Sequence, residues 1–320
     1  MSLTKTARRR TVFRCRFTTI GFACLLCLGS LELPAAEFPP ELVEFEPYAE
    51  NPIFTGAGPG HWDVKIRERG WIRREADGYV MWYTGYDGDK AAIKLLGYAT
   101  SADGLHWTRF AGNPLVRDHW VEDMMVVKQG STYTMVAEGR SDIAQLLTSS
   151  DKLHWELRGS LDVRRADGSP IGAGPYGTPA LWFEKDVWYL FYERGDRGVW
   201  LAKSTDTKVW TNVSDEPVLG LGPEAYDKFA IALNQVVKYQ GRYYAYYHAA
   251  DALPWKRWST NIATSTDLVH WEKYARNPIV VNNESSALLI DDGERFRLYT
   301  MHDQVRVRFS RVKPPARLEP

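Results

Sequence analysis

Acidic side chains in this chain recur beside aromatic β-type segments, where several could act on one substrate. Five of them are candidates for acid, base or nucleophile, namely Asp63, Glu68, Glu122, Asp123 and Glu193. Cleavage of a glycosidic bond needs one carboxylic acid to protonate the leaving oxygen and a second carboxylate to activate water or attack the anomeric carbon. Crowded carboxylates raise each other's pKa, which lets one stay protonated as the acid. These residues therefore favour glycosidic chemistry if the fold brings them together.

The same segments carry further polar side chains that could hold a substrate. The candidates are Arg67, Arg69, Glu138, Arg140, Arg194, Asp227, Lys228, Asn234, His248 and His302. We expect a carbohydrate substrate. Because arginine binds carboxylates and sulfates bidentately, an anionic sugar is a subsidiary hypothesis. A structural alternative exists for Glu138 and Glu193, since each is followed closely by an arginine and could form an ion pair between sheets.

No spacing of metal-ligating residues specifies a metal site, so no catalytic metal or cofactor is predicted. A structural divalent ion in a central channel is left open as an alternative. The 40 basic side chains balance the 40 acidic ones. This balance gives no reason to expect nucleic acid or an anionic membrane as a partner.

A repeated phrase indicates the elements that position these residues. It consists of a dipeptide led by Ser, an Asp, three spacer residues and a Trp, and its four copies are Ser101–Trp107, Ser149–Trp155, Ser204–Trp210 and Ser265–Trp271. The steps between the tryptophans are 48 (155−107), 55 (210−155) and 61 (271−210) residues, which is typical of a radial β repeat. We expect the Asp to bond its own backbone in a turn and the Trp to pack in the strand that follows.

Five aromatic segments mark five units, although only four carry the Trp phrase. These predicted second strands are 79–85, 133–139, 188–194, 243–249 and 296–302, and the links between units carry Asn51-Pro52, Asn113-Pro114, Glu216-Pro217 and Asn277-Pro278. Residues 42–48 are expected to form the outermost strand of the last unit, so that N- and C-terminal strands pair. The prediction is an all-β, five-bladed β-propeller forming a single domain over residues 37–320.

Residues 1–36 differ from the rest. Five arginines between Arg8 and Arg16 precede an apolar run from Ile20 to Leu28, and small residues end the segment at Ala36. This order predicts a cleaved signal peptide and a periplasmic or secreted protein with no membrane segment after cleavage. Twin-arginine export through Arg9-Arg10 and lipidation at Cys24 or Cys27 are the weaker alternatives. All three cysteines lie in this leader, so no disulfide is expected in the mature chain.

The Ser/Thr-x-Asp…Trp phrases, the Asn-Pro links and the Trp62-Asp63 segment resemble the five-bladed glycoside hydrolases of families 43, 32, 68, 117 and 130. The resemblance spans about residues 40–310. It implies that Asp63 is the base or nucleophile, that Asp123 tunes its pKa and that Glu193 is the acid. The chain lacks the Asp-Pro and Glu-Gly-Pro motifs common in family 43. Glu68 and Glu122 lie at equal distances before their hairpins (79−68 and 133−122, both 11), so either could replace Asp63 or Asp123. A histidine acid, as in family 117, would be His302.

The resulting hypothesis is an exported glycoside hydrolase that acts on chain ends, because a narrow propeller channel suits an exo-acting enzyme. One alternative is a glycoside phosphorylase in which Arg140, Arg194 and Lys228 hold phosphate. The other is a glycan-binding propeller with no catalysis. In that reading Trp62, Trp120 and Tyr176 would be stacking platforms.

Overall fold

The computed structural model describes residues 38–171 and 176–319, which belong to one compact unit, Ala36–Pro320. The predicted leader at 1–36 lies outside the described residues. Within the described part, no helix is long and apolar enough to cross a membrane.

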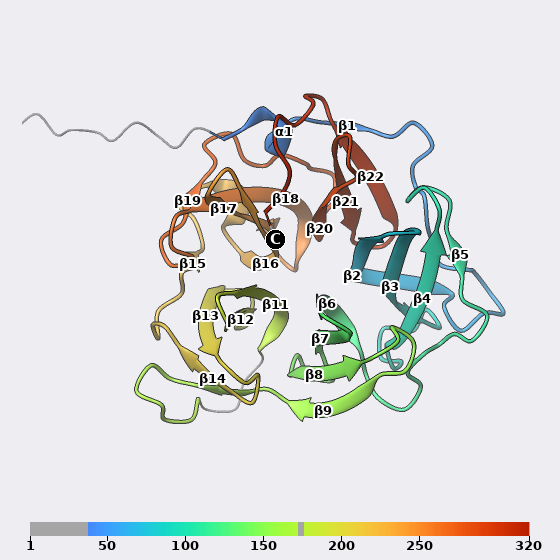
Figure 1. The fold of residues 1–320 in the computed structure, drawn as a ribbon, viewed down its shortest axis with the longest axis horizontal. Coiled ribbons are helices and arrows are strands. Elements are labelled where there is room, and N and C mark those ends of the chain that lie inside the picture. Colours follow the sequence, from blue (N-terminus) through green and yellow to red (C-terminus); the bar gives the residue numbers. More distant parts are fainter. Residues whose placement is uncertain (1–37, 172–175, 320) are drawn as a thin grey trace, which may run out of the picture. The chain divides into compact units, whose positions relative to one another are not determined.

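Five mainly antiparallel sheets are arranged around a common centre, each forming one blade (Figure 1). Blade one contains β2 (Lys65–Glu75), β3 (Gly78–Tyr86), β4 (Leu95–Ser101) and β5 (Thr108–Arg109). Blade two contains β6 (Glu122–Gln129), β7 (Thr132–Glu138), β8 (Ala144–Ser149) and β9 (Glu156–Ser160). Blade three contains β10 (Asp162–Arg164), β11 (Gly177–Glu184), β12 (Val187–Glu193), β13 (Gly198–Ser204), β14 (Val209–Asn212) and β15 (Leu219–Gly220).

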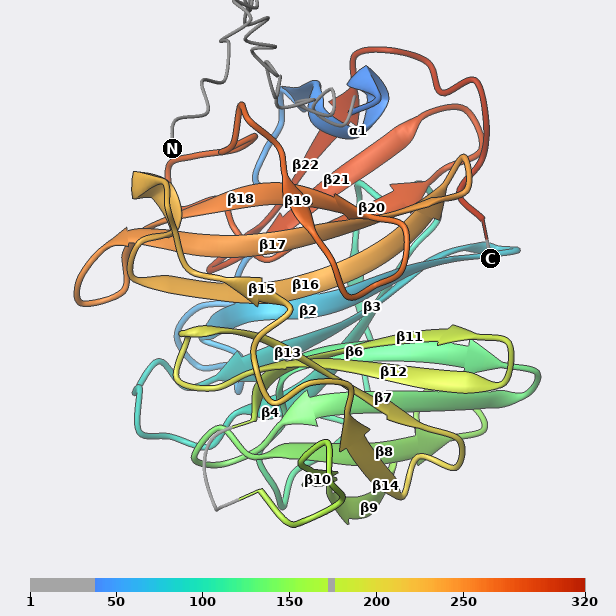
Figure 2. The same cartoon turned by 90° about the vertical axis from the view of Figure 1, so that its left-hand side faces the viewer.

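Blade four follows the 3-10 turn η1 (Ala225–Asp227) and contains β16 (Ala230–Tyr239), β17 (Arg242–Ala252), β18 (Lys256–Ser265) and β19 (Glu272–Lys273). Blade five contains β20 (Ala287–Asp291), β21 (Phe296–Met301), β22 (Val305–Ser310) and the N-terminal strand β1 (Phe45–Pro47). The predicted five-bladed propeller, closed by pairing of N- and C-terminal strands, is confirmed. Viewed from the side, the β11–β12 and β16–β17 turns lie at one face and the β17–β18 turn at the other (Figure 2).

The N-terminal closing segment is shorter than predicted. Residues 42–48 are not one strand, because α1 (Pro40–Val43) comes first and only Phe45–Pro47 pairs with β22. A proline in the first turn of a helix leaves no hydrogen bond unmade, which favours α1 at this position. Leu42 of α1 is fully buried, and its carbonyl accepts a hydrogen bond of 2.8 Å from the Tyr246 hydroxyl, so α1 fixes the chain end to blade four.

The four Trp phrases are structural turns, as predicted. In the first, the Asp103 carboxylate accepts hydrogen bonds from the backbone N–H groups of Leu105 and His106, and Ser101 Oγ accepts one from Gly104. The other three copies repeat this pattern. Trp210 lies within β14, whereas the other three tryptophans each come one residue before a strand. The phrases therefore cap strands and do not form the site.

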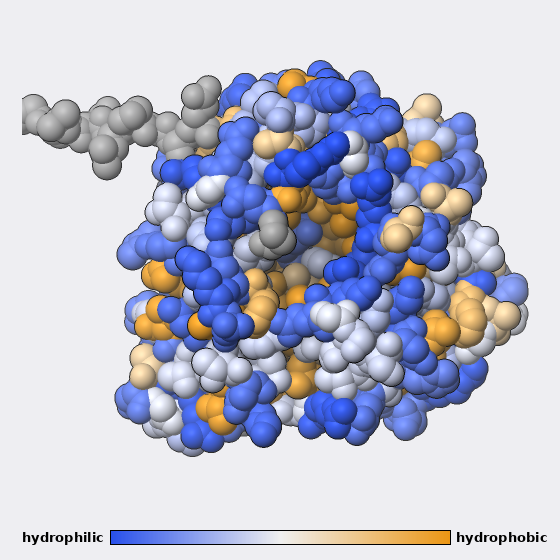
Figure 3. Space-filling view, viewed as in Figure 1, coloured by the Kyte–Doolittle hydropathy of each residue, from blue (hydrophilic) through white to orange (hydrophobic). Residues whose placement is uncertain are grey.

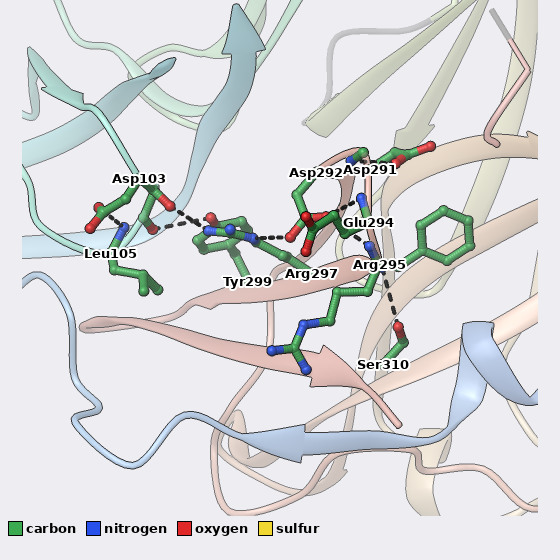
Figure 4. A network of polar contacts seen from close by, with 12 residues as sticks. Asp103, Leu105, Asp291, Asp292, Glu294, Arg295, Arg297, Tyr299 and Ser310 are labelled. Atoms are coloured by element: carbon green, nitrogen blue, oxygen red, sulfur yellow. Dashed lines mark hydrogen bonds and ion pairs between the residues drawn. The ribbon is translucent and has the colours of Figure 1, made fainter. Parts of the chain in front are cut away.

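In addition to the β1–β22 pairing inside blade five, a polar network joins the last blade to the first (Figure 4). The Arg297 guanidinium on β21 bonds the Asp292 carboxylate at 2.7 Å and the Asp103 carbonyl of blade one at 2.5 Å. The Tyr299 hydroxyl donates to the Gly104 carbonyl at 3.1 Å. The turn that carries the Trp phrase of blade one therefore accepts the hydrogen bonds by which blade five contacts blade one.

The innermost strands of the blades are β2, β6, β11, β16 and β20, which contact one another around the centre. In the first four, the pairing register shifts close to the start of the strand. A left-handed backbone conformation occurs there at Arg69, Asp123 and Thr178, with φ of 48°, 46° and 45°. Such bulges re-aim side chains, here toward the centre of the ring. Figure 3, viewed as in Figure 1, looks onto the face opposite the β17–β18 turn, where the β11–β12 and β16–β17 turns lie, and shows a central hollow with apolar residues inside a mostly hydrophilic rim.

Candidate active site

A cavity of about 760 Å³ is formed by the beginnings of the innermost strands and the ends of the strands paired with them. Seven of its lining residues carry carboxyl groups, namely Glu68, Asp123, Glu138, Asp142, Glu193, Asp196 and Asp303. The other lining residues are Ile66, Arg67, Tyr86, Lys90, Thr178, His248, Pro254, Trp255, Trp258 and His302. The predicted convergence of carboxylates from several blades is therefore observed.

Strand register brings two glutamates to one backbone position. Glu193, the last residue of β12, pairs with Gly177 at the start of β11, and Glu138 ends the neighbouring strand β7. Glu138 Oε2 accepts a hydrogen bond of 3.0 Å from the Thr178 backbone N–H. A Cβ atom on Gly177 would overlap Glu193 Oε1 and would lie 3.0 Å from Glu138 Oε2. The absence of a side chain at Gly177 is what lets both carboxyls approach the same point.

Both glutamates are held in a state that resists ionisation. Burial raises the pKa of Glu193 to about 8, and the charge of Asp196 adds to the effect. Burial, the charge of Asp123 and a hydrogen bond with Asp142 raise the pKa of Glu138 well above its usual value. The Glu193 carboxyl is also fixed in place, because the Asp196 backbone N–H donates to its Oε2 at 2.5 Å. At neutral pH Glu193 is therefore a positioned carboxylic acid.

Asp123 is a buried carboxyl with unused hydrogen-bonding capacity. Its side chain is 7% exposed, and burial, reinforced by the charge of Glu68, raises its pKa to about 7. Thr178 Oγ1 lies 3.5 Å from Oδ2, while Oδ1 has no hydrogen-bond partner among the described atoms. A buried polar atom without a partner is unusual in a native structure, which marks Asp123 as a candidate functional group.

Glu68 is held in its ionised form. Burial opposes its ionisation, but the hydrogen bond and charge of His302, with a further contribution from Arg67, lower its pKa to about 2. Glu68 Oε2 lies 2.9 Å from His302 Nδ1. This pairing outweighs the burial of His302 and raises the histidine's pKa. Glu68 and His302 thus form an ion pair at the wall of the cavity.

His248 is a neutral imidazole that contacts Asn234 and Trp258. Burial lowers its pKa to about 4, and its Nδ1 lies 2.9 Å from the Asn234 amide nitrogen. Because the amide donates this bond, Nδ1 is the acceptor and Nε2 carries the proton. The ring also packs edge-on against Trp258, with centroids 5.0 Å apart. His248 can therefore donate one hydrogen bond to a ligand.

The position predicted for Asp63 needs a correction, since among the described residues Asp63 does not line the cavity. It is 1% exposed, and its Oδ2 accepts bonds from Arg109 Nε at 2.7 Å and from the Tyr83 hydroxyl at 3.1 Å. Asp63 precedes β2, whereas Glu68, five residues later (68−63) and inside β2, reaches the cavity. Asp63 therefore links the start of blade one to β3 and to Arg109 at its outer strand.

Replacement of this buried carboxylate should cost stability and leave catalysis intact. We expect Asp63→Asn to lower the free energy of unfolding by about 1–3 kcal/mol, because Arg109 loses its charged acceptor. Urea denaturation measures this, with Asp118→Asn, at a carboxyl 88% exposed, as the control. If Asp63→Asn kept its stability but lost kcat by orders of magnitude, a chemical role for Asp63 would be restored.

Three predicted residues support the cavity from behind its wall. Glu122 is buried, forms an ion pair with Arg67 and accepts a 2.8 Å bond from the Trp120 indole. Arg69 is fully buried and donates to the carbonyls of Leu233 and Pro179, which ties β2 to β16 and β11. Asn234 acts through His248, as described above. None of these three side chains is among the described lining residues.

The remaining predicted substrate-binding residues lie elsewhere. Asp227 is fully buried in an ion pair of 2.5 Å with Lys273. The exposed Lys228 is over the Phe229 ring, while Arg140 lies over Trp120 and Arg194 over Tyr176. The stacking platforms proposed for a glycan-binding propeller are also engaged: Trp62 stacks on Tyr83 and Tyr176 packs edge-on against Tyr192.

Sequence reasoning missed several lining residues, all of them on loops or at strand ends. They are Tyr86, Lys90, Asp142, Pro254, Trp255 and Trp258. The sequence does contain one signal for Trp255. The Pro254-Trp255 pair lies between the segments that form β17 and β18, where a turn with an exposed aromatic side chain could be expected. No group of three or more His, Cys, Asp or Glu residues in the described part of the chain is arranged to hold a metal ion.

Comparison with known proteins finds similarity to carbohydrate-active enzymes. No family model matches the chain. A 1,2-β-oligomannan phosphorylase from Thermoanaerobacter sp. (strain X514) is 28% identical over 173 residues, which cover 50% of this chain and 54% of the relative. The alignment thus spans about half of the relative's length.

Solved structures match over more of the chain. A β-1,2-mannobiose phosphorylase from Listeria innocua has a TM-score of 0.65 and 16% identity, covering 83% of this chain and 96% of its own. A structure of the GH130 family of mannoside phosphorylases, which contains glycoside hydrolases that target β-1,2-mannosidic linkages in Candida mannan, has a TM-score of 0.67 and 16% identity, covering 86% and 96%. The chain therefore has the five-bladed β-propeller fold that solved glycoside hydrolases and mannoside phosphorylases share.

Proposed function

We propose that this protein hydrolyses an O-glycosidic bond in the carboxyl-lined cavity. The observation that carries the proposal is the convergence of a protonated acid, Glu193, with the buried Asp123 and the ionised Glu68 in one cavity. Carboxyl groups whose environments push their pKa values apart are the arrangement that acid–base cleavage of a glycoside needs.

Each carboxyl has a role that follows from its environment. Glu193 protonates the leaving oxygen, because it is a carboxylic acid at neutral pH and a backbone N–H holds it in place. Asp123 accepts the proton of the attacking water, because its raised pKa makes it a base near neutral pH. Glu68 stays ionised beside His302, and its charge keeps the proton affinity of Asp123 high enough for a base. Compared with the sequence-based assignment, Asp123 replaces Asp63 as the base and Glu68 becomes the tuning carboxylate.

The charges of the cavity favour a neutral sugar. Seven carboxyl-bearing residues line it, against Arg67 and Lys90 as the lining lysine and arginine side chains of the described chain. Arg67 is already paired with Glu122, which leaves few cations to hold a uronate or sulfate. Because its relatives act on β-1,2-linked mannosides, we propose this linkage as the first substrate to examine.

The pH dependence of kcat/KM should be bell-shaped. Activity requires Asp123 without its proton, so it should rise as pH increases through about 7. It requires Glu193 with its proton, so it should fall as pH increases through about 8. Initial rates from pH 5 to 10 test this prediction, with apparent values that belong to the coupled carboxyl set. A rate still rising at pH 10 would contradict Glu193 as the acid.

Phosphorolysis is the second candidate function. Lys90 and Arg67 line the cavity and could hold phosphate in place of water, and the sequence relative is a phosphorylase. The phosphate site predicted from Arg140, Arg194 and Lys228 is not supported, because those side chains lie over aromatic rings outside the described lining.

A glycan-release assay separates these functions. Residues 37–320 are incubated with β-1,2-mannobiose and with other neutral oligosaccharides, in the presence and absence of phosphate. Hydrolysis yields reducing sugar without phosphate, whereas phosphorolysis yields a sugar phosphate only when phosphate is present. Binding without any product, in a screen that includes the natural linkage, would overturn both. Export through the predicted leader also remains a proposal, tested by the N-terminal sequence of the protein recovered outside the cytoplasm.

A further inference from the structure

The hairpin between β17 and β18 places an exposed indole at the mouth of the cavity. Trp255 is 53% exposed, and both Pro254 and Trp255 line the cavity. Figure 2 shows this hairpin extending further to the left than the neighbouring strands. Trp255 combines this exposure with a position above a site rich in carboxyls.

The indole is held in a defined orientation. Its Nε1 donates a 2.7 Å hydrogen bond to Asp196 Oδ2, which joins the hairpin of blade four to the loop after β12 in blade three. The backbone of Trp255 is left-handed, with φ of 45°, a conformation that bulky residues adopt only where the surroundings impose it. Its neighbour Leu253 is 60% exposed but is not among the described lining residues. The exposed ring is therefore a positioned surface, which reduces the entropy lost when a ligand stacks on it.

Asp196 connects this surface to the acid. The side chain of Asp196 accepts the bond from Trp255, and its backbone N–H donates to Glu193 Oε2 at 2.5 Å. The acid delivers its proton to the oxygen that leaves with the second sugar. A ring stacked on Trp255, on the solvent side of Glu193, is consequently on the leaving-group side of the bond.

We propose that Trp255 is the stacking platform for the leaving-group sugar. The ligand is a neutral hexopyranose whose C–H face packs on the indole while its hydroxyls bond the surrounding carboxyls. This inference rests on the proposed function, since it names the part of the same cavity that binds the departing sugar.

Binding measurements in an inactive background test the platform without requiring turnover. We would measure calorimetric affinities of β-1,2-mannobiose and mannose for Glu193→Gln and for the double variant Glu193→Gln/Trp255→Ala. Loss of the platform should weaken mannobiose about tenfold or more and leave mannose nearly unchanged. Trp255→Phe should retain much of the affinity, because it keeps a flat ring without the N–H. Leu253→Ala, on the same hairpin, is the matched control.

Equal weakening of both sugars, or none, would overturn the inference, as would binding of neither sugar to Glu193→Gln. Failure of the platform can be distinguished from failure of the proposed hydrolysis. Selective loss of mannobiose binding combined with no cleavage by the unmodified protein would keep the platform and reject the enzyme. Cleavage by the unmodified protein, combined with a disaccharide affinity that does not change in the Trp255→Ala background, would keep the enzyme and reject the platform.

Discussion

Glu193→Gln is expected to lower kcat by about 10²–10⁴-fold, the range typical of general acid catalysis. Glutamine has the same shape and still accepts the bond from the Asp196 N–H, but it has no proton to give to the leaving oxygen. The alkaline fall of the pH profile should disappear in the residual activity, because the group that titrates at about 8 has been removed.

Two controls give this result its meaning. Glu156→Gln, at an exposed carboxyl paired with Arg158 on the outer strand β9, should leave kcat unchanged. A substrate with a good leaving group, such as an aryl glycoside, should recover much of the lost rate in Glu193→Gln, because it departs without protonation. An undiminished kcat on the natural disaccharide would reject Glu193 as the acid.

Gly177→Ala should reduce activity by about 10²-fold without unfolding the protein. The new methyl group would overlap Glu193 Oε1 and approach Glu138 Oε2, so both carboxyls must move. Because these atoms end flexible side chains, the backbone can stay in place. A displacement of about 1 Å in a catalytic group is enough for a loss of this size.

The matched control for this change lies in the same blade. Gly220→Ala adds a methyl group at a position where no described heavy atom lies within 4 Å. Its kcat and urea midpoint should match those of the unmodified protein, whereas Gly177→Ala should differ in kcat alone. Equal activity of the two variants would show that the approach of the two glutamates is not needed.

The repeat carries most of the information about the fold. The Trp phrases recur because each strand end needs the same Asp and Ser bonds to its turn, so their count and spacing report the blades. The short helix α1 was not predictable in the same way. Its proline restrains the backbone, but its place depends on Leu42 fitting a buried space beside blade four.

The sequence predicted which ends of the strands form the site, but it identified only some of the residues that line it. Glu193 and Glu138 were found because both end second strands, a position that the aromatic segments reveal. The choice between Asp63 and Glu68 depended on the register shift between Arg67 and Trp71, which no sequence pattern marks. Asp142 and Trp255 come from loops, whose paths depend on contacts with other blades.

The measurement that tests the central claim most directly is the fate of labelled water. β-1,2-Mannobiose is incubated with the protein in ¹⁸O-water containing phosphate, and the masses of the products are measured by mass spectrometry at short times. The proposed reaction, with Asp123 activating water and Glu193 protonating the bridging oxygen, predicts one ¹⁸O atom at the anomeric carbon of the released non-reducing sugar. Unlabelled sugar phosphate, or the absence of cleavage for this and other neutral linkages, would contradict it.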